Sequence, residues 1–285
     1  MTVFADNANS VTAPILENEE IAKNTMRVRV LVPEMAAKVV PGQFFMIRNP
    51  SGNDPLIGRA FALYDACPHK GWLDLVYLVK GKLTTSIAPL APRAELAIWG
   101  PLGNGFPPAK TEHLIMVAGG IGQTPFLTLA REALGNQSFG AEPRMSGYAR
   151  RVSFCYGVRN ASYLAGLDQF RDAGCELHIA SEDGSQPDGS TDRAERVTDT
   201  LSRLLDADDS EKRIVCCGPE PMMEAVAEIA HLRGVPCQIS LETPMACGIG
   251  ICFTCVAKIG CAEDWDYKRT CVEGPVFDAE QVIWD

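Results

Sequence analysis

Four cysteines near the C-terminus constrain the fold of this chain more than any other feature. Three of them stand in the run CGIGICFTC at 247–255, a C-x4-C-x2-C spacing, and the fourth follows further on. This is the spacing of plant-type [2Fe-2S] sites, in which four thiolates hold two irons. Gly248 and Gly250 would let a short loop wrap closely around such a cluster and direct backbone N–H groups at sulfur. The sequence therefore predicts a [2Fe-2S] cluster held by Cys247, Cys252, Cys255 and Cys271.

Three other interpretations of the cysteines stay open from the sequence, namely a structural zinc site, simple buried thiols and a different fourth ligand. A structural zinc site normally uses paired C-x2-C hooks, and here the second hook is missing because Cys271 has no near partner. Cys261, in the segment KIGCAED that is typical of a loop, is the rival for the fourth ligand. The cysteines that lie in or beside apolar runs are expected in the core; they are Cys67, Cys155, Cys175, Cys216 and Cys237.

Charge and hydropathy exclude several classes of function. The 26 basic and 36 acidic residues give a net charge of -10 with no basic block, which argues against binding to nucleic acid or to an anionic membrane. A phosphate-bearing cofactor remains possible, because a helix N-terminus or a single arginine can hold one. No apolar run approaches the roughly 20 residues that span a bilayer, and the N-terminus lacks the pattern of a secretory signal. The expected compartment is the cytosol, where the eleven cysteines stay reduced.

From residue 15 to residue 105 the chain alternates short β-rich runs with turn residues. The turn segments are PGQ, NPSGND, PHKG and APLAP, and the runs between them are 26–32, 43–49, 60–65, 73–79 and 94–100. Many short strands separated by Pro and Gly predict an antiparallel sandwich or barrel. Residues 1–14 are polar and are expected to form a flexible tail.

After residue 106 the pattern changes to strands that alternate with helices. Helical runs follow the first, second and fourth of the expected apolar strands, which are 114–119, 151–158, 175–181 and 213–218. This order predicts a parallel α/β sheet over residues 106–234, with a surface loop at 136–149. Residues 235–285, with the cysteine run and few helix signals, are predicted to form a small cluster domain.

Two glycine-containing turns follow predicted strands and open predicted helices. The first is GGIGQTP at 119–125, and the second is CCGPEPM at 216–222. Backbone N–H groups and the helix dipole at such a turn favour a diphosphate, and parallel sheets bind ligands at the carboxyl ends of their strands. Either turn alone is also typical of an ordinary strand-to-helix connection. Together they favour a dinucleotide site.

Arg59, in the β-rich half, follows a glycine and precedes the run AFA. An arginine beside an aromatic residue can pair with the diphosphate of a flavin while the backbone lies along the flavin ring. Taken alone, it is more typical of a surface ion pair. The turn cluster GPLGNGF at 100–106 joins the two halves, as a hinge or as the floor of a site between them.

Together these segments resemble the ferredoxin-NADP reductase superfamily, and within it the family of electron-transfer subunits of NAD-dependent dihydroorotate dehydrogenase. The resemblance runs from about residue 15 to residue 285. It is carried by PGQFFMIR, GRAFALYD, GPLGNGF, VAGGIGQTP, CGPEPMM, MACGIGICFTC and YKRTCVEGPVFDAEQVIW, of which the last two are the most specific. It implies a multidomain chain with an antiparallel β-barrel FAD domain, an α/β parallel-sheet nucleotide domain and a small C-terminal [2Fe-2S] domain.

The resemblance also implies cofactor contacts, residue by residue. FAD would be met by Arg59, Ala60, Phe61, Ala62, Tyr77, Leu78, Val79, Thr84 and Thr85. NAD or NADP would be met by Gly119, Gly120, Ile121, Gly122, Gln123, Thr124, Cys217, Gly218, Pro219 and Met222. The sequence departs from the family at Ala62, where a Ser or Thr hydroxyl usually hydrogen-bonds the flavin. It also lacks the second glycine of the family's phosphate loop, where GKLT stands at 81–84.

The implied function is that of an enzyme subunit that transfers electrons and needs no acid-base catalytic residue. A nicotinamide exchanges a hydride, a [2Fe-2S] cluster takes one electron at a time, and a flavin can do both. The expected partner is an FMN-containing catalytic subunit that oxidises dihydroorotate in pyrimidine biosynthesis, in a hetero-oligomer. One alternative is a diaphorase subunit of a sulfide dehydrogenase, a hydrogenase or an NADPH:ferredoxin oxidoreductase. The other is a non-enzymatic flavin- or nucleotide-binding sensor module, supported only by Ala62 and the altered phosphate loop.

Overall fold

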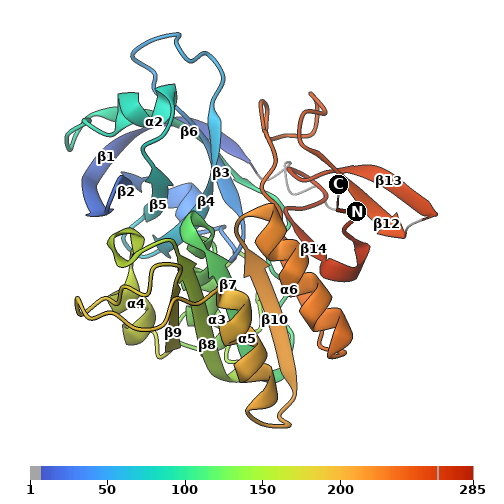
Figure 1. Ribbon diagram of the computed structural model, residues 1–285. Coiled ribbons are helices and arrows are strands. Elements are labelled where there is room, and N and C mark those ends of the chain that lie inside the picture. Colours follow the sequence, from blue (N-terminus) through green and yellow to red (C-terminus); the bar gives the residue numbers. More distant parts are fainter. Residues whose placement is uncertain (1–7, 262, 285) are drawn as a thin grey trace.

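The computed structural model describes residues 8–261 and 263–284, which form three parts in contact with one another (Figure 1). A closed β-barrel comes first, an open sheet with flanking helices follows, and a small C-terminal part with a two-stranded hairpin completes the chain. This arrangement confirms the predicted fold class. Within the described ranges, no helix combines the length and the apolar character needed to cross a membrane.

The barrel closes in the order β1-β2-β5-β4-β3-β6, and its neighbouring strands are antiparallel. Its core follows the period-two alternation of strand side chains: Leu73, Leu75 and Tyr77 of β5 point inward, as do Leu96 and Ile98 of β6. Short helices α1 (Pro33–Ala36) and α2 (Lys82–Ile87) lie between strands. The strands are β1 (Asn9–Ala22), β2 (Thr25–Leu31), β3 (Phe44–Arg48), β4 (Arg59–Cys67), β5 (Trp72–Leu78) and β6 (Glu95–Leu102).

The flexible tail predicted for residues 1–14 is wrong for residues 9–14. These residues begin β1 and pair with β6, from Asn9 opposite Gly100 to Pro14 opposite Glu95. The stretch looks polar because Ala13 is its only side chain that points into the barrel, and the next one is Ile15. The side chains of residues 10–12 are exposed. Residues 1–7 of the predicted tail lie outside the described residues.

The open sheet has the order β14-β11-β10-β7-β8-β9. Its five strands β11 to β9 are parallel, and β14 joins antiparallel at the edge. The predicted parallel α/β sheet is therefore present, with apolar strands buried on both faces as such sheets require. The strands are β7 (Thr111–Gly119), β8 (Ala149–Val158), β9 (Glu176–Ser181), β10 (Lys212–Cys217), β11 (Cys237–Ser240) and β14 (Val276–Asp278).

Helices cover both faces of this sheet. Helices α3 (Phe126–Ala133) and α4 (Leu167–Asp172) touch each other, and α5 (Val197–Asp206) and α6 (Glu220–Leu232) form a second contacting pair. Each pair belongs to a different buried apolar cluster, so the pairs lie on opposite faces. No element was predicted where α5 lies. The other three helices match the helical runs expected from the sequence.

Two side-chain contacts tie the barrel to the helices of the sheet. Arg131 on α3 places Nη1 2.5 Å from Oδ1 of Asp65 on β4. The Tyr64 hydroxyl, also on β4, donates a 2.6 Å hydrogen bond to Oε1 of Gln169 on α4. Arg131 and Gln169 both lie on helices that flank the open sheet, so the barrel and the sheet are held in one orientation around the space between them.

The boundary predicted at residue 235 does not separate a free-standing cluster domain. Strands β11 and β14 both fall within 235–285, yet both belong to the open sheet. They are only four and three residues long, too short for an apolar pattern to reveal them. What remains outside the sheet is the cysteine loop and the hairpin of β12 (Val256–Cys261) and β13 (Asp264–Arg269). The 3-10 turn η4 (Ala279–Gln281) comes directly after β14.

Candidate functional site

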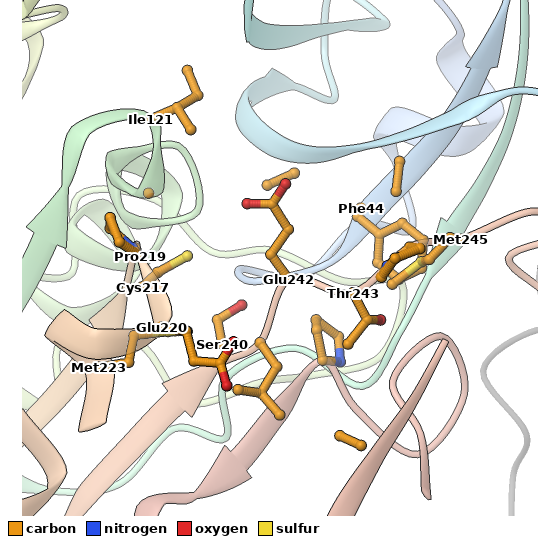
Figure 2. A pocket seen from close by; sticks show the side chains of 18 of the residues that line it. Phe44, Ile121, Cys217, Pro219, Glu220, Met223, Ser240, Glu242, Thr243 and Met245 are labelled. Carbon is orange, nitrogen blue, oxygen red and sulfur yellow. The ribbon is translucent and has the colours of Figure 1, made fainter. Parts of the chain in front are cut away.

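A cavity of about 680 Å³ lies where the three parts of the chain meet. Barrel residues on β3 to β5, the turns at the carboxyl ends of β7 and β10, and residues 240–245 after β11 all line it. Figure 2 shows the carboxyl group of Glu242 directed into the space between Ile121 on one wall and Phe44 on the opposite wall. The geometry therefore unites the two turns predicted to bind a nucleotide with the strand predicted to bind a flavin.

The two glycine turns pack directly against each other. A Cβ atom on Gly122 would lie 2.2 Å from the carbonyl oxygen of Cys217, and one on Gly119 would lie 2.6 Å from Sδ of Met222. A Cβ on Gly218 would meet Met222 Cε at 2.6 Å. Gly119, Gly122 and Gly218 are therefore glycines because the two turns pack too closely for a side chain. Gly120 differs: its φ is +54° and no atom stands within 4 Å of its Cβ position, so its backbone is open to a ligand.

Only part of each predicted turn lines the cavity. Ile121, Gly122, Thr124, Cys217, Gly218 and Pro219 line the cavity, whereas Gly119, Gly120, Gln123 and Met222 do not. The Gln123 side chain is fully buried, and neither its amide nitrogen nor its oxygen has a hydrogen-bond partner in the described structure. Between β7 and α3 the first turn forms a short 3-10 turn, η2 (Gly120–Gln123).

From Ala60 to Ala62, strand β4 alternates between the cavity and the barrel core. Arg59, Ala60 and Ala62 line the cavity, and the Phe61 ring packs 5.5 Å from the Tyr77 ring, against the barrel interior. The Arg59 guanidinium donates only to the carbonyls of residues 57 and 58, at 3.1 and 3.0 Å, and no carboxylate among the described residues pairs with it. A surface ion pair is therefore not what holds this arginine. Its charge lies at the cavity wall, and a guanidinium of this kind can pair with a diphosphate.

The three residues at and after the end of strand β5 that were expected to contact the flavin do not line the cavity. The Tyr77 side chain is enclosed in the barrel core, where its hydroxyl is 3.4 Å from Oδ1 of Asn18, and burial raises its pKa. Leu78 and Val79 do not line the cavity either, whereas Val76 does. Alternation explains this: if residue 77 points into the barrel, residue 76 points out of it.

The two threonines expected at the diphosphate lie on α2. The Thr84 hydroxyl accepts hydrogen bonds from the backbone N–H groups of Lys80 and Gly81, at 2.9 and 3.0 Å, and so caps the start of the helix. Thr85 is exposed on the first turn. The altered phosphate loop is therefore closed by a threonine cap in place of a second glycine. The free hydroxyl at this position belongs to Thr85.

The four cysteines of the predicted cluster lie together as two pairs. Sγ of Cys255 is 3.1 Å from Sγ of Cys271, both buried, and the more exposed Cys252 thiol interacts with that of Cys247. Cys247 also interacts electrostatically with Cys271, so the pairs are adjacent. No three metal-binding side chains of the described residues converge on one point. Two pairs of thiolates suit two irons, each of which takes two protein ligands in a [2Fe-2S] cluster.

One cysteine of each pair has a shifted pKa, and the two shifts have opposite directions. The Thr254 hydroxyl, 3.1 Å from Cys252 Sγ, and the neighbouring Cys247 thiol lower the pKa of Cys252 to about 6. Burial, reinforced by Cys255, raises the pKa of Cys271 to about 12. The exposed side of the site thus favours the thiolate that binds iron, and iron must displace a proton on the buried side.

Backbone N–H groups face the sulfur atoms, as the sequence predicted. The N–H of Ile249 lies 3.4 Å from Cys247 Sγ, and the N–H of Gly250 hydrogen-bonds Cys271. Gly248 and Gly250 have φ values of +74° and +83°, which a side chain would strain. Cys261, the rival ligand, is exposed at the far end of β12. The donor set fits a [2Fe-2S] cluster.

Two residues near these sites carried no signal in the sequence. Trp99 on β6 donates its indole N–H to the Cys247 carbonyl at 2.9 Å. Glu242 follows β11 and interacts electrostatically with Cys217, whose pKa is raised to about 12 mainly by burial, so Cys217 stays a thiol at neutral pH. Neither residue is part of a motif that spacing alone could reveal; a carboxylate just past the carboxyl end of a parallel strand was the only available hint.

Comparison with family models divides the chain into three matches. Residues 12–106 match the oxidoreductase FAD-binding domain, and residues 116–228 match the oxidoreductase NAD-binding domain. Residues 242–283, which include all four predicted ligands, match the iron-sulfur cluster binding domain of dihydroorotate dehydrogenase B. The predicted FAD, nicotinamide nucleotide and iron-sulfur sites are confirmed at the level of domains. The chain is a flavin-dependent oxidoreductase subunit.

Whole-chain relatives agree with these domain matches. The chain is 32% identical over 274 residues to the dihydroorotate dehydrogenase B (NAD(+)) electron transfer subunit of Desulforamulus reducens, which covers 96% of this chain and 98% of the relative. It is 34% identical over 258 residues to that of Geobacillus kaustophilus, covering 89% of each. A solved structure of the NADH-dependent reduced ferredoxin-NADP oxidoreductase superposes with a TM-score of 0.79 at 25% identity, covering 95% of this chain and 90% of that one. The chain therefore belongs to the family of dihydroorotate dehydrogenase B (NAD(+)) electron transfer subunits.

Proposed function

We propose that this chain passes electrons between a nicotinamide nucleotide and the FMN of a catalytic partner subunit that oxidises dihydroorotate. The observation that supports it best is the convergence of three cofactor-binding parts on one cavity, with the cysteine loop packed against the barrel behind it. FAD supplies the exchange between hydride and single electrons that neither the nicotinamide nor the cluster can perform alone. The protein has only to hold the cofactors in order, so its residues bind and orient.

We propose the residue roles that the resemblance implies, and we separate the residues at the cofactor surface from those that support it from behind. For FAD, Arg59 neutralises the diphosphate, Ala60 and Ala62 present the wall of β4, and Thr85 and the α2 terminus follow the phosphate chain. Phe61, Tyr77, Leu78, Val79 and Thr84 support this surface from behind. For the nicotinamide nucleotide, the wall is Ile121, Gly122, Thr124, Cys217, Gly218 and Pro219, backed by Gly119, Gln123 and Met222, and Gly120 leaves its backbone open next to Ile121.

The exposed rim of the cysteine loop is the face we propose for the partner subunit. Ile251 and Phe253, on either side of Cys252, are 73% and 62% exposed, although both are large and apolar. Apolar side chains gathered at a redox centre are typical of a protein interface. Ile251→Ser is expected to weaken association with the catalytic subunit. Leu232→Ser, a change of similar exposure at the end of α6, is expected to leave it intact.

We propose the cytosol as the compartment. All eleven cysteines are free thiols in the structure, which agrees with a reducing environment. An oxidising compartment would endanger the close Cys255 and Cys271 pair before iron is bound.

The function is tested by combining the purified chain with the FMN-containing catalytic subunit under anaerobic conditions. Addition of dihydroorotate and NAD+ is expected to produce orotate and NADH in equal amounts, with each subunit alone inactive in this coupled reaction. Association without coupled NAD+ reduction would contradict the proposed electron route. Dihydroorotate oxidation coupled to NAD+ in the absence of this chain would remove its role altogether.

A second candidate is supported by the superposition on the NADH-dependent reduced ferredoxin-NADP oxidoreductase. In that case the electrons at the cluster face would come from a different flavoprotein subunit or from reduced ferredoxin. Supplying reduced ferredoxin in place of dihydroorotate and the FMN subunit separates the two functions. Nicotinamide reduction with ferredoxin alone would favour the second candidate.

A further inference from the structure

Trp99 links the barrel to the cysteine loop. On β6 the side chains at 96 and 98 fill the barrel, so the Trp99 indole lies on the outer side of the wall. There its Nε1–H donates a 2.9 Å hydrogen bond to the carbonyl oxygen of Cys247, a residue 148 positions away. The indole also packs on the small apolar cluster that contains buried Cys255 and Cys271. One side chain thus binds the loop at Cys247 and packs on the apolar cluster that surrounds Cys255 and Cys271.

The other edge of the same indole faces the flavin strand. A Cβ atom on Gly58, the residue before Arg59, would come within 2.5 Å of Trp99 Cη2, so this backbone lies directly on the ring. Met46 of β3 pairs with Ala60 on one side and with Trp99 on the other. Trp99 and Met46 therefore form the layer of protein between the β4 surface proposed for FAD and the cysteine loop.

The cysteine loop fits this layer closely. A Cβ atom on Gly248 would lie 2.7 Å from Met46 Cγ and 2.9 Å from Leu102 Cδ1. Because C=O and N–H of one trans peptide point in opposite directions, the bond to Trp99 also directs the Gly248 N–H away from the indole. The backbone at the first cluster ligand is thereby held in position and orientation by the barrel.

We propose that Trp99 is a positioning residue for electron transfer between flavin and cluster, and that its N–H group raises the reduction potential of the cluster. A donor that binds the backbone of a ligand residue places the positive end of its dipole near the electron that the reduced cluster gains. Removing the donor removes this stabilisation of the reduced form. The inference rests on the proposed function, since it presupposes that FAD and a cluster occupy their sites.

The test uses the full-length chain loaded with FAD and cluster, and three forms of it: wild type, Trp99→Phe and Trp72→Phe. Trp99→Phe keeps an aromatic ring on the outer side of β6 but has no N–H donor. Trp72→Phe is the matched control, because Trp72 lies on β5 with its ring 3.8 Å from the Arg29 guanidinium and away from the cysteine loop. The cluster is followed by EPR in an anaerobic redox titration, and the flavin by its visible bands after NADH is added.

At the wild-type midpoint potential, Trp99→Phe is expected to hold roughly threefold less reduced cluster relative to oxidised cluster, with altered EPR g values. Trp72→Phe is expected to match the wild type, and the rate of flavin bleaching by NADH is expected to be the same in all three. EPR reports only intact clusters, so partial loss of iron does not affect the comparison. Identical cluster potentials and spectra in Trp99→Phe and the wild type would overturn the inference. A wild-type chain with no NADH-reducible cluster would instead overturn the proposed function.

Discussion

The sulfur atoms of Cys255 and Cys271 lie 3.1 Å apart, although the two residues are sixteen positions apart in the sequence. The hydrogen bonds from the N–H and the hydroxyl of Thr270 to the Cys255 carbonyl, at 2.8 and 3.1 Å, bring the two segments together. This contact supports our proposal that Cys271 and not Cys261 is the fourth ligand, because Cys261 is exposed at the end of β12.

The choice of ligand predicts opposite results for two serine substitutions. Cys271→Ser is expected to lose most of the iron and inorganic sulfide after anaerobic reconstitution, because one iron is left with a single thiolate. Cys261→Ser is expected to keep the wild-type amounts. Iron and sulfide analysis with the visible spectrum decides the matter, and the reverse pattern would assign the cluster to Cys261.

Because the two nucleotide turns are in contact, adding a single methyl group at Gly122 is expected to lower the stability of the chain. In Gly122→Ala the new Cβ would stand 2.2 Å from the backbone carbonyl of Cys217, which cannot move without shifting the second turn. Forced overpacking of this kind costs about 1–3 kcal/mol. We expect a lower free energy of unfolding and a raised KM for NADH. Gly52→Ala, where nothing lies within 4 Å, should leave both unchanged. Equal behaviour of the two variants would show that the turns can separate freely.

The position of Arg59 predicts weaker flavin binding when its charge is removed. A hydrogen bond to a charged group contributes about 1.5–3 kcal/mol, so Arg59→Ala is expected to raise the Kd for FAD about 10- to 100-fold. Arg150→Ala is the control, because Arg150 is exposed and pairs only with Glu112 among the described carboxylates. Fluorescence of released FAD measures the Kd. An unchanged Kd in Arg59→Ala would place the diphosphate elsewhere.

A buried histidine predicts how stability depends on pH. His113 lies at the amino end of the sheet, where Nε2 is 2.8 Å from the Ser153 hydroxyl, and burial, with the Arg151 charge as a smaller cause, lowers its pKa to about 4. The folded chain therefore binds this proton less tightly than the unfolded chain. The contribution of neutral His113 to the free energy of unfolding is expected to be complete above pH 6.5. It is expected to fall by about 2–3 kcal/mol as the pH drops toward 4.

The histidine contribution is isolated by comparing the wild type with His113→Asn in urea titrations at pH 7 and pH 5. The variant is expected to lose less stability between the two pH values. The buried carboxyl groups of Asp65, Asp74 and Glu132, whose pKa values burial raises, act in the opposite direction but equally in both proteins. A parallel loss in the two proteins would mean that another group controls the acid transition.

Much of this architecture could be predicted because strong local patterns coincide with it. The apolar runs of β7, β8 and β10, the short β-rich runs of β2 to β6 between turn residues and the cysteine spacing all identify their elements without tertiary information. Helix α5 also has a local pattern, because Val197, Leu201 and Leu205 recur at a spacing of four and are buried. It follows a polar loop, which concealed its start.

Other features depend on contacts between distant segments and leave no local pattern. Strand β1 has few inward side chains and is recognisable only from its pairing with β6. Tyr77 was assigned to the flavin by resemblance, but the phase of β5 in the barrel turns its side chain inward. Trp99 has no motif of its own, because its role arises from a loop that follows 148 residues later.

We propose that NADH, FAD and the cluster form one electron route in this chain, and an anaerobic visible spectrum before and after addition of NADH reports on the whole route. We expect flavin bands with a cluster shoulder at longer wavelength, and bleaching of both by NADH. Bleached flavin beside a cluster that stays oxidised would break the route between them. Flavin without any cluster in anaerobically prepared protein would contradict the four-cysteine site, and absence of both after reconstitution would leave the chain as a binding module only.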